Sequence, residues 1–415
     1  MLDTQKIGAF LCRKRKERQM TQQQLADRLH VSFQAVSKWE TGAATPNIEF
    51  LPLLGKLLAV SVDEILHGEE KRDTGLSYRQ AGVDISYTDA MKQEMAEYLK
   101  TEDPRVLNGL GPYAALYDVA FPEIAHPVLV LKSEEPGSKQ KIAVEYGYTE
   151  SICHDMINHL VNDIVVMGAR PLAVLDTIVC GNAERDTIRA LVKGVSAACR
   201  ANGCALVGGE TSIQPQVVEK GLYVLTASIA GIVERDRVVD GSAIRPGDAV
   251  LALASNGVHT NGYSLIRMLM EQQPAVKLDR IAGETFIEQI MKPHTAYGAA
   301  VRRLLEQVDV HGMAHITGGG IAGNLCRVMP DGCSAQIDLK QLRVPPIFRH
   351  IQKKGAVAES EMLSTFNCGA GFLLVVAQAD KARAIRCMQP FHACYEIGTI
   401  AEGTEKVVLH GHIDW

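Results

Sequence analysis

Residues 21–40 read TQQQLADRLHVSFQAVSKWE, and this stretch decides the fold of the N-terminal end of the chain. Thr21 stands three residues before Gln24, which is the spacing of a capping box, so we expect a helix from Thr21 to His30. A second helix is expected from Ser32, because alanine, valine and tryptophan recur there on one helical side. The connection between them allows only a tight turn, so the pattern predicts two short helices packed against each other.

The helical pattern continues on both sides of this stretch. Upstream, apolar residues at helical spacing lead into a basic run, Arg13–Arg18, that forms a solvated face. Downstream, Gly42 and Pro46 end the second helix, and Asn47 is placed to cap the next one. Apolar residues from both flanks close a small core, namely Ile7, Phe10, Leu11, Ile48, Leu51, Leu54, Leu58, Val60, Val62, Ile65 and Leu66.

The first 68 residues resemble the phage-repressor-like (Xre-type) helix-turn-helix family. The blocks T-Q-x-x-L-A, V-S-x-x-x-V-S-K-W-E and P-x-x-x-x-L all occur in order. The resemblance implies an all-α domain that binds double-stranded DNA as a dimer, with the second helix in the major groove. It places four polar residues against the duplex, namely Gln22, Gln34, Ser37 and Lys38. A domain that keeps this fold but only mediates protein contacts is the alternative.

The charge distribution agrees with a protein that binds a polyanion through one end of its chain only. The chain carries a formal net charge of −5, yet its first 40 residues hold eight Lys and Arg against four Asp and Glu. A basic end joined to a larger acidic body is expected when that end alone meets nucleic acid. A solvated basic helix face would give the same count, so the charge supports the motif without replacing it.

Length and composition indicate a globular protein of two or three domains. The chain has 415 residues, of which 47% are hydrophobic and 22% charged, which excludes disordered and collagen-like classes. Because we find neither a run of about 18 apolar residues nor a signal peptide, we expect a cytoplasmic protein with no membrane partner. The ten cysteines form no CxxC pair, and no tight His/Cys cluster occurs, which argues against disulfides and against a zinc site.

The rest of the chain alternates short apolar runs with longer helical patterns, which predicts a mixed α/β (α+β) body. The polar, glycine-containing segment HGEEKRDTGLS lies at the junction, so we expect a linker at 69–76 after the domain at 1–68. The glycine-marked SNGVHTNG at 255–262 suggests a change between two halves of the body. We place those halves at 77–245 and 246–415.

Several polar residues beside glycines suit a phosphate and metal site. The turn from Thr317 through Gly318, Gly319 and Gly320 offers backbone amides, and Asn324 follows on a predicted helix. Carboxylates beside such turns suit Mg²⁺ that is completed by substrate phosphates, and Asp155 shares a helix face with Asn162 two turns later. Unliganded glycine turns and helix caps are the alternatives. His259, Asn261 and Asn367 stand in similar turns.

Eight ordered blocks resemble aminoimidazole ribonucleotide synthetase, also called phosphoribosylformylglycinamidine cyclo-ligase. The blocks are SYRQAGVDI (77–85), LNGLGPYAAL (107–116), VNDIVVMGARPL (161–172), LVGGET (206–211), VVDGSAIRPGD (238–248), GVHTNGYSL (257–265), VDVHGMAHITGGG (308–320) and TFNCGAG (365–371). The resemblance implies two α/β halves, the first of which pairs across a homodimer into a β-barrel. It also implies ATP, Mg²⁺ and closure of the imidazole ring of formylglycinamidine ribonucleotide.

The resemblance also implies residue roles. Metal ligands would be Glu134, Asp155 and Glu210. Nucleotide contacts would come from Ser133, Glu134, Gly137, Ser138, Lys139, Asn162, Asp163, Gly208 and Gly209. Substrate contacts would come from Thr211, Thr317, Gly318, Gly319 and Gly320, and catalytic groups from His259, Asn261 and Asn367.

The phosphate loop departs from the family pattern. The family has a signature close to T-D-G-V-G-T-K where this chain has SEEPGSK at 133–139. Glu135 adds a negative charge and bulk in place of a glycine, and Pro136 removes an amide donor. Two functions therefore remain open. One is a working cyclo-ligase that carries a DNA-binding domain. The other is a transcription regulator whose body senses a purine-pathway ribonucleotide or an adenine nucleotide without turnover.

Overall fold

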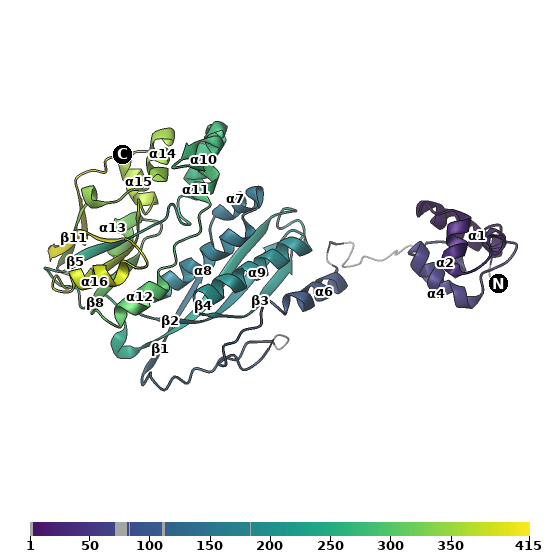
Figure 1. Ribbon diagram of the computed structural model, residues 1–415, viewed down its shortest axis with the longest axis horizontal. Helices are drawn as coiled ribbons and strands as arrows, with labels where there is room; N and C mark the ends of the chain where they lie inside the picture. Colours follow the sequence, from purple (N-terminus) through teal and green to yellow (C-terminus); the bar gives the residue numbers. More distant parts are fainter. Residues whose placement is uncertain (1–2, 71–80, 83, 110–112, 183) are drawn as a thin grey trace. The chain divides into compact units, whose positions relative to one another are not determined.

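The computed structural model describes residues 3–415 except 71–80, 83, 110–112 and 183. The chain divides into two compact units, Met1–Gln80 and Ala81–Trp415 (Figure 1). Most of the predicted linker, the expected start of the body at Ser77 and most of the block at 77–85 lie outside the described residues.

The first unit is all α, as predicted. Its helices are α1 (Thr4–Glu17), α2 (Gln22–Leu29), α3 (Phe33–Glu40), α4 (Leu51–Leu58) and α5 (Val62–His67), with a short 3₁₀ turn η1 (Ile48–Phe50). The predicted capping box is present, because the Thr21 hydroxyl accepts from the Gln24 amide and the Gln24 side chain accepts from the Thr21 amide. The Ser32 hydroxyl caps α3 by accepting from the Ala35 amide. The prediction for Asn47 was wrong, since its side chain makes no capping hydrogen bond at η1.

Close helix packing holds the first unit together. Gly8 lets α1 approach α3, since a Cβ at this position would lie 2.4 Å from the carbonyl oxygen of Trp39. Glu40 at the end of α3 accepts from Arg15 Nε at 2.6 Å and from Gln22 Nε2 at 2.7 Å. One buried carboxylate therefore ties three helices together.

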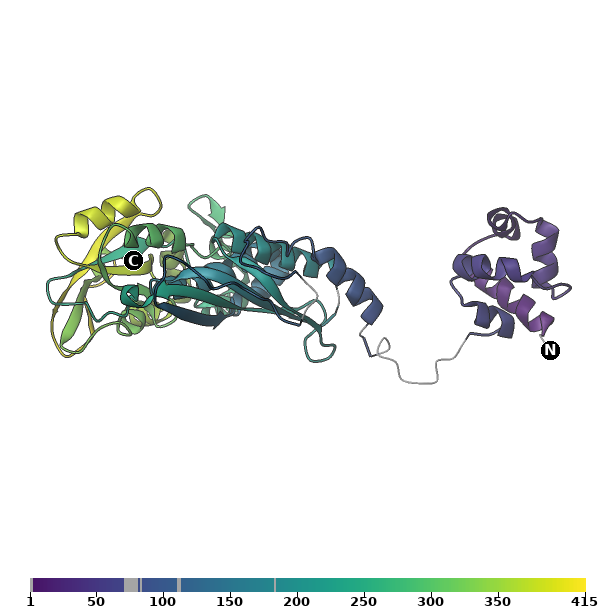
Figure 2. The same ribbon diagram turned by 90° about the horizontal axis from the view of Figure 1, so that it is seen from below.

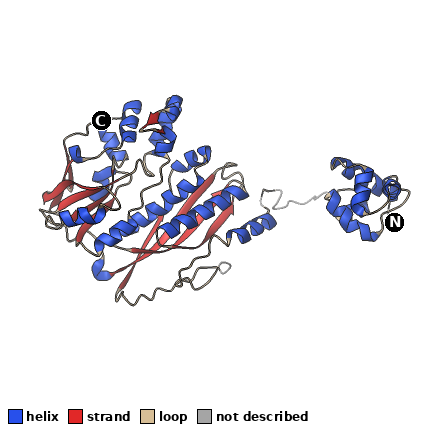
Figure 3. Ribbon diagram, viewed as in Figure 1, coloured by secondary structure: helices blue, strands red, loops and turns tan. Residues whose placement is uncertain are grey.

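The first half of the second unit is a four-stranded sheet with helices on one face. Its strands are β1 (Pro127–Glu134), β2 (Arg170–Cys180), β3 (Ala205–Ile213) and β4 (Tyr223–Glu234), in the order β1-β4-β2-β3. Helices α8 (Thr149–Val165) and α9 (Arg185–Ala201) lie across this sheet (Figure 3), and Figure 2 shows that they share one side of it. Two further helices, α6 (Ile85–Met95) and α7 (Lys139–Tyr146), complete this half.

The other face of this sheet carries exposed apolar side chains. Leu129 and Leu131 on β1 are 56% and 71% exposed, and Leu175 on β2 is 49% exposed. Within one chain the sheet is open, with β1 and β3 as its two edges, so no closed barrel forms from the described residues.

The second half is built on a six-stranded sheet of order β12-β9-β11-β5-β10-β8. Its strands are β5 (Ala249–Ala254), β8 (Val310–His315), β9 (Cys333–Asp338), β10 (Ala370–Val376), β11 (Cys394–Glu402) and β12 (Val407–His410); a separate small hairpin pairs β6 (Arg280–Ile281) with β7 (Glu284–Thr285). Its helices are α10 (Tyr263–Gln272), α11 (Phe286–Ile290), α12 (Gly298–Leu305), α13 (Gly320–Leu325), α14 (Pro346–Gly355), α15 (Glu359–Thr365) and α16 (Lys381–Met388). Three short 3₁₀ turns are η2 (Arg235–Arg237), η3 (Pro274–Leu278) and η4 (Leu339–Gln341).

The two sheets are separated in sequence by residues 235–248. The glycine-marked segment 255–262 follows β5, so it lies inside the second half and does not mark the change between halves as its composition suggested. In the part of the chain that the structure describes, no helix is both long enough and apolar enough to cross a membrane.

Candidate functional site

Helix α8 carries a buried polar face that meets the second half of the body. Asn158 Nδ2 donates to the carbonyl oxygen of His294 at 2.7 Å. Asn162 Nδ2 donates to the carbonyl oxygen of Thr295 at 2.9 Å, and Asn162 Oδ1 accepts from the Tyr297 amide at 3.0 Å. This amide side chain therefore holds the backbone of residues 294–297, and the nucleotide role predicted for Asn162 would have to displace that contact.

The first cluster on this face, Lys139 with Asp155, is sealed, which means that neither side chain reaches solvent. Lys139 Nζ lies 2.8 Å from both carboxylate oxygens of Asp155, and it also donates to the carbonyl oxygens of His259 and Lys292. Neither side chain is exposed. Burial raises the pKa of Asp155 to about 6 although the ammonium opposes this shift, and burial lowers the pKa of Lys139.

Two predicted roles lose their physical basis in this arrangement. Lys139 was expected to contact phosphates and Asp155 to bind metal, but the ammonium already has three oxygen-bearing partners and the pair faces no open space. The reason is that a buried lysine must be surrounded by acceptors to remain charged. We therefore treat the pair as part of the core.

A second cluster, eight residues further along α8, is open. Lys132 Nζ on β1 lies 2.9 Å from Glu134 Oε2 and 3.1 Å from Asp163 Oδ2. His159 Nε2 lies 3.6 Å from the same Asp163 oxygen. The Lys132 side chain is 37% exposed and lines a pocket of about 320 Å³ together with Asp163 and Arg327. This volume lies in the range of small-molecule sites.

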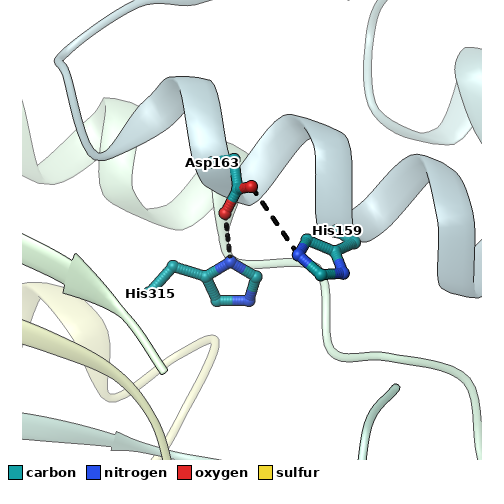
Figure 4. A group of neighbouring side chains, drawn as sticks. All are labelled: His159, Asp163 and His315. Carbon is teal, nitrogen blue, oxygen red and sulfur yellow. Dashed lines mark hydrogen bonds and ion pairs between the residues drawn. The ribbon is translucent and has the colours of Figure 1, made fainter. Parts of the chain in front are cut away.

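Asp163 belongs to a ring of polar side chains, and Figure 4 shows it beside two other members, His315 and His159. His315 Nδ1 lies 2.6 Å from Asp163 Oδ1, and His315 Nε2 lies 2.8 Å from His294 Nε2. The hydroxyl of Thr260 lies 3.3 Å from His294 Nδ1 and 3.1 Å from His159 Nδ1, and His159 faces Asp163 again. Burial opposes the charge of Asp163, but the hydrogen bond from His315 keeps the pKa of this carboxyl well below its usual range. Burial lowers the pKa of His159 to about 4.

When the imidazoles of this ring are neutral, the numbers of donors and acceptors determine which nitrogen of each histidine carries the hydrogen. Because the Asp163 carboxylate only accepts, His315 Nδ1 carries the hydrogen and His315 Nε2 accepts from His294 Nε2. His294 Nδ1 then accepts from the Thr260 hydroxyl, which accepts in turn from His159 Nδ1. The ring therefore leaves a lone pair on His159 Nε2, directed at the open cluster.

The glycine turn before α13 lies beside the same pocket, and its amides are partly used. The amide of Gly319 donates to the carbonyl oxygen of Ser364, and the amide of Gly320 donates to that of Thr317. Asn324 lines the pocket and donates to the carbonyl oxygens of Gly318 and Gly320. These bonds leave fewer free amides than the prediction of a phosphate-binding loop assumed.

A second pocket of about 350 Å³ is lined by Ser138, which was predicted to contact nucleotide, by Asn261, which was predicted to be catalytic, and by Thr260. Gly318 borders Asn261, since a Cβ on this glycine would lie 3.4 Å from Asn261 Oδ1. His259 is buried beside them. Its Nε2 lies 3.0 Å from the Thr295 hydroxyl, its ring stacks on His294 at 4.0 Å, and its Nδ1 is buried without a partner among the described residues.

Asn367 does not lie free for catalysis. It is buried, its Oδ1 accepts from the Ser255 hydroxyl and the Gly369 amide, and its Nδ2 donates to the carbonyl oxygen of Gly257. All of these partners belong to turns of the second half. The side chain therefore shapes the loops around the pocket, and the catalytic role predicted for it has no free group to perform it.

The residues predicted on β3 lie far from the open cluster. Gly208, Gly209, Glu210 and Thr211 all belong to β3, which is one edge of the sheet, whereas Ser133 and Glu134 belong to β1, the other edge. With β4 and β2 between them, Glu134 and Glu210 are separated by about 14 Å at the usual strand spacing. One chain therefore cannot bring the predicted carboxylates Glu134, Asp155 and Glu210 around one ion.

Some residues beside these sites were missed in the sequence. Asp176 on β2 is buried, and burial raises its pKa to about 7. Gly209 makes room for it, because a Cβ there would lie 1.9 Å from Asp176 Oδ1. A lone carboxylate inside the apolar run of β2 was the available signal. His159, His294 and Lys132 gave no comparable signal, because their partners lie on other elements.

In the first unit, two of the predicted DNA contacts are open and two are not. Gln34 and Lys38 are exposed on α3. Ser37 is half-buried, and the Gln22 amide is engaged with Glu40. The exposed pair remains available to a major groove in the way the motif predicts.

Comparison with known proteins identifies the family of each part of the chain. Residues 126–233 and 245–411 match the N-terminal and C-terminal domains of the AIR synthase related protein family, and residues 13–65 match a helix-turn-helix family. The phosphoribosylformylglycinamidine cyclo-ligase of Nitrosospira multiformis is 41% identical over 335 residues, which cover 80% of this chain and 95% of that protein. The chain belongs to the phosphoribosylformylglycinamidine cyclo-ligase family.

Other members and more distant structures extend the comparison. The cyclo-ligase of Paraburkholderia phymatum is 40% identical over 334 residues, which cover 80% of this chain and 94% of that protein. Crystal structures of thiamine-monophosphate kinase from Stenotrophomonas maltophilia and of the hydrogenase maturation protein HypE in complex with ATP give TM-scores of 0.56 and 0.57 at 19% and 17% identity. The kinase match covers 80% of this chain and 97% of that structure, and the HypE match covers 79% of this chain and 92% of that structure. At identities this low, the two matches show a shared fold.

Proposed function

We propose that the body closes the imidazole ring of formylglycinamidine ribonucleotide in an ATP-dependent reaction. The observation that carries this proposal is the 41% identity to a cyclo-ligase across 95% of that enzyme's length. In this reaction the formyl oxygen attacks the γ-phosphorus of ATP and ADP leaves. An internal nitrogen then attacks the activated carbon, phosphate leaves with the former formyl oxygen, and one proton is released.

The open pocket suits such a substrate. Lys132 and Arg327 supply positive charge for phosphate groups, and Asn324 supplies a polar side chain at the glycine turn. Asp163 and His315 line the same pocket, so the ring of polar side chains reaches its wall. Fixed charges in a site that excludes water stabilise the developing phosphate charge without reorganisation.

Mg²⁺ fits two carboxylates that contact Lys132, namely Asp163, which lines the pocket, and Glu134. Glu134 and Asp163 each place an oxygen about the Lys132 ammonium, so their geometry already suits a cation. These two residues would hold the ion, and the ion would neutralise the triphosphate. Asp163 takes the place first expected for Asp155, which is sealed against Lys139.

A coupled assay for aminoimidazole ribonucleotide with the purified full chain tests the proposal. We expect ATP-dependent product formation, and a loss of at least about 100-fold in kcat for Asp163→Asn, because the carboxylate that would hold the ion beside the phosphates is removed. Asp279→Asn is the matched control, since Asp279 also pairs with a histidine and a lysine but lies outside the pocket. Absence of product under all nucleotide conditions would overturn the proposal.

The exposed sheet face supports a homodimer. Leu129, Leu131 and Leu175 form an apolar surface on one side of the four-stranded sheet, and such surfaces commonly mark interfaces. We infer that two copies pack through this face and that their sheets together form the barrel expected from the family. Light scattering should give a dimer at micromolar concentration, and Leu131→Asp should give a monomer. A wild-type monomer would contradict the inference.

We also infer that residues 1–68 bind double-stranded DNA. Support comes from the helix-turn-helix match over 13–65 and from the exposure of Gln34 and Lys38 on α3. A dimer would present two such units to paired half-sites. Selection of duplexes from a random pool by the full chain tests this inference, and equal recovery of all sequences would reject specific binding.

A sensor without turnover is the second candidate. The sealed Lys139 favours it, because the lysine of the phosphate loop is withdrawn from any ligand. Glu135 also adds a negative charge to this loop, and Pro136 removes an amide donor. Calorimetry distinguishes the two functions. If neither wild type nor Glu135→Gly binds ATP while a purine-pathway ribonucleotide still binds, the sensor replaces the enzyme.

A further inference from the structure

A third pocket, of about 340 Å³, is formed by helices α12 and α16 of the second half, which contact each other (Figure 1). Three arginines line it, namely Arg303 from α12 and Arg383 and Arg386 from α16. Phe391, which follows α16, adds an aromatic ring to its wall. We propose that this pocket binds a nucleotide, with the phosphates against the arginines and the base against Phe391.

The positive charge of this pocket has no carboxylate to balance it. No Asp or Glu lines the pocket, and no carboxylate in the described part of the chain forms an ion pair with any of the three arginines. By contrast, Lys381 on the same helix pairs with Glu396 at 2.9 Å. All three arginines are exposed, although the chain as a whole carries a net charge of −5. The pocket therefore offers three free guanidinium groups to an anion.

Two features of α16 disfavour this arrangement when no anion is bound. Arg383 and Arg386 stand three residues apart, a spacing that brings like charges together on one side of a helix. Arg383 also lies in the first turn of α16, which contains no acidic residue, and the helix dipole disfavours a cation there. A bound anion would offset both costs, which is the reason to assign the arginines to a ligand.

The chemistry of the wall favours a nucleotide among anions. A guanidinium group donates two parallel hydrogen bonds to phosphate oxygens, and groups from two helices can hold a diphosphate from different sides. Phe391 is 43% exposed, and the guanidinium carbon of Arg303 lies 5.9 Å from its ring centroid. An exposed aromatic ring beside phosphate donors gives a nucleobase a surface on which to stack. The volume lies in the range of small-molecule sites.

This pocket is separate from the proposed ring-closure site. It shares no lining residue with the pocket that contains Asp163 or with the pocket that contains Asn261. Because no carboxylate lines it, nucleotide binding here needs no metal ion, whereas ATP at the ring-closure site would use Mg²⁺. The inference therefore goes beyond the proposed function, and a chelator of Mg²⁺ separates the two kinds of binding.

ADP is the probe, with the full chain in buffer that contains EDTA. Calorimetry should show ADP binding that weakens at least about tenfold in Arg386→Gln, because a charged phosphate contact is lost. Arg349→Gln is the matched control, since Arg349 is also an exposed helical arginine but lies on α14, outside the pocket. This variant should bind ADP as wild type does. Equal ADP affinity of wild type and a folded Arg386→Gln would overturn the inference.

A change at the aromatic ring tests for the base. Phe391→Leu keeps an apolar side chain but removes the ring, so ADP binding should weaken at least about fivefold. The affinity of this variant for pyrophosphate, which has no base, should equal that of wild type. Equal affinity of the wild-type protein for ADP and pyrophosphate would overturn the assignment to a nucleotide.

Photolabelling keeps the test independent of whether a variant folds. Wild-type full chain irradiated with 2-azido-ADP in EDTA should be modified in the tryptic peptide 387–406, which contains Phe391, and excess ADP should prevent the modification. Labelling confined to other peptides would overturn the inference. Weaker binding of duplex DNA by Arg386→Gln, with ADP binding unchanged, would also overturn it and would assign the arginines to nucleic acid.

Discussion

Helix α8 carries two lysine–carboxylate clusters two turns apart, and they differ in their access to solvent. Asp155 and Lys139 are completely buried, and backbone carbonyl groups complete the shell of the ammonium. Asp163 and Lys132 border a pocket, and the ammonium there contacts two carboxylates and keeps part of its surface in water. The same pair of residue types thus builds core in one place and a candidate site in the other.

The difference teaches that burial and the number of partners, more than residue type, separate structural from functional charges. A sealed pair has no group left for a ligand, and breaking it leaves a charge in a dry interior. An open pair can exchange its partner for a ligand at small cost in stability. The following predictions separate the two kinds of cluster by measurement.

The largest effect is expected from Lys139→Met. The change leaves the Asp155 carboxylate buried without its cation, so the free energy of unfolding should fall by about 3–5 kcal/mol. Urea denaturation followed by circular dichroism measures this loss. The double variant Lys139→Met with Asp155→Leu is the control, and it should recover most of the stability because it removes both charges. A loss no larger than that of Lys132→Met would show that the pair is not sealed.

Asp176 is a buried carboxylate that is not paired with a lysine, and it extends the comparison of the two clusters. Asp176 has a folded-state pKa of about 7, raised by burial, against about 3.9 in an unfolded chain. Because the folded state holds the proton more tightly, the contribution of Asp176 to the stability should fall as the pH rises from about 4 to 7 and then stay level. Asp176→Asn should therefore be the more stable protein at pH 8, by up to about 4 kcal/mol, with little difference at pH 4. Thermal unfolding at both pH values tests this, and a pH-independent difference would contradict it.

The first unit offers the same contrast between sealed and open groups. Glu40 is enclosed by Arg15 and Gln22, whereas Gln34 and Lys38 are exposed. If α3 reads DNA, Gln34→Ala should cost about 1–3 kcal/mol on a selected duplex and relax its sequence preference. Lys38→Ala should weaken binding to all duplexes. It should also reduce the slope of log affinity against log salt concentration by about one.

Gel-shift titrations at several salt concentrations distinguish the two DNA effects. Lys56→Ala on α4 is a matched control, because this lysine is also exposed but lies outside α3. Equal losses for Lys38→Ala and Lys56→Ala would mean that charge alone, and no particular helix, drives binding.

The smallest effect on stability is expected from Lys132→Met. Its ammonium is partly solvated, so the free energy of unfolding should change by less than about 1 kcal/mol. The same variant should alter ligand binding in the pocket, which Lys139→Met cannot do directly. Urea denaturation beside the Lys139→Met measurement gives the comparison, and a loss above about 3 kcal/mol would place Lys132 with the sealed cluster.

The sequence alone determined the fold of the first unit and the family of the body. Capping residues act over three or four positions, so Thr21 with Gln24 and Ser32 placed two helices correctly. The ordered blocks indicated the cyclo-ligase family before any geometry was known. Local patterns also paired Asp155 with Asn162 on one helix face.

Only the tertiary structure decided which of these polar residues are free. Lys139 and Asn367 stand in motifs that suggest ligand binding, yet both are fully engaged by groups far away in the sequence. The sequence contains no compact histidine motif, yet α8, β8 and the loops before α10 and α12 bring His159, His315, Thr260 and His294 into one ring. The reason is physical, since capping and periodicity act within one element, whereas solvent access and metal geometry depend on residues from several elements.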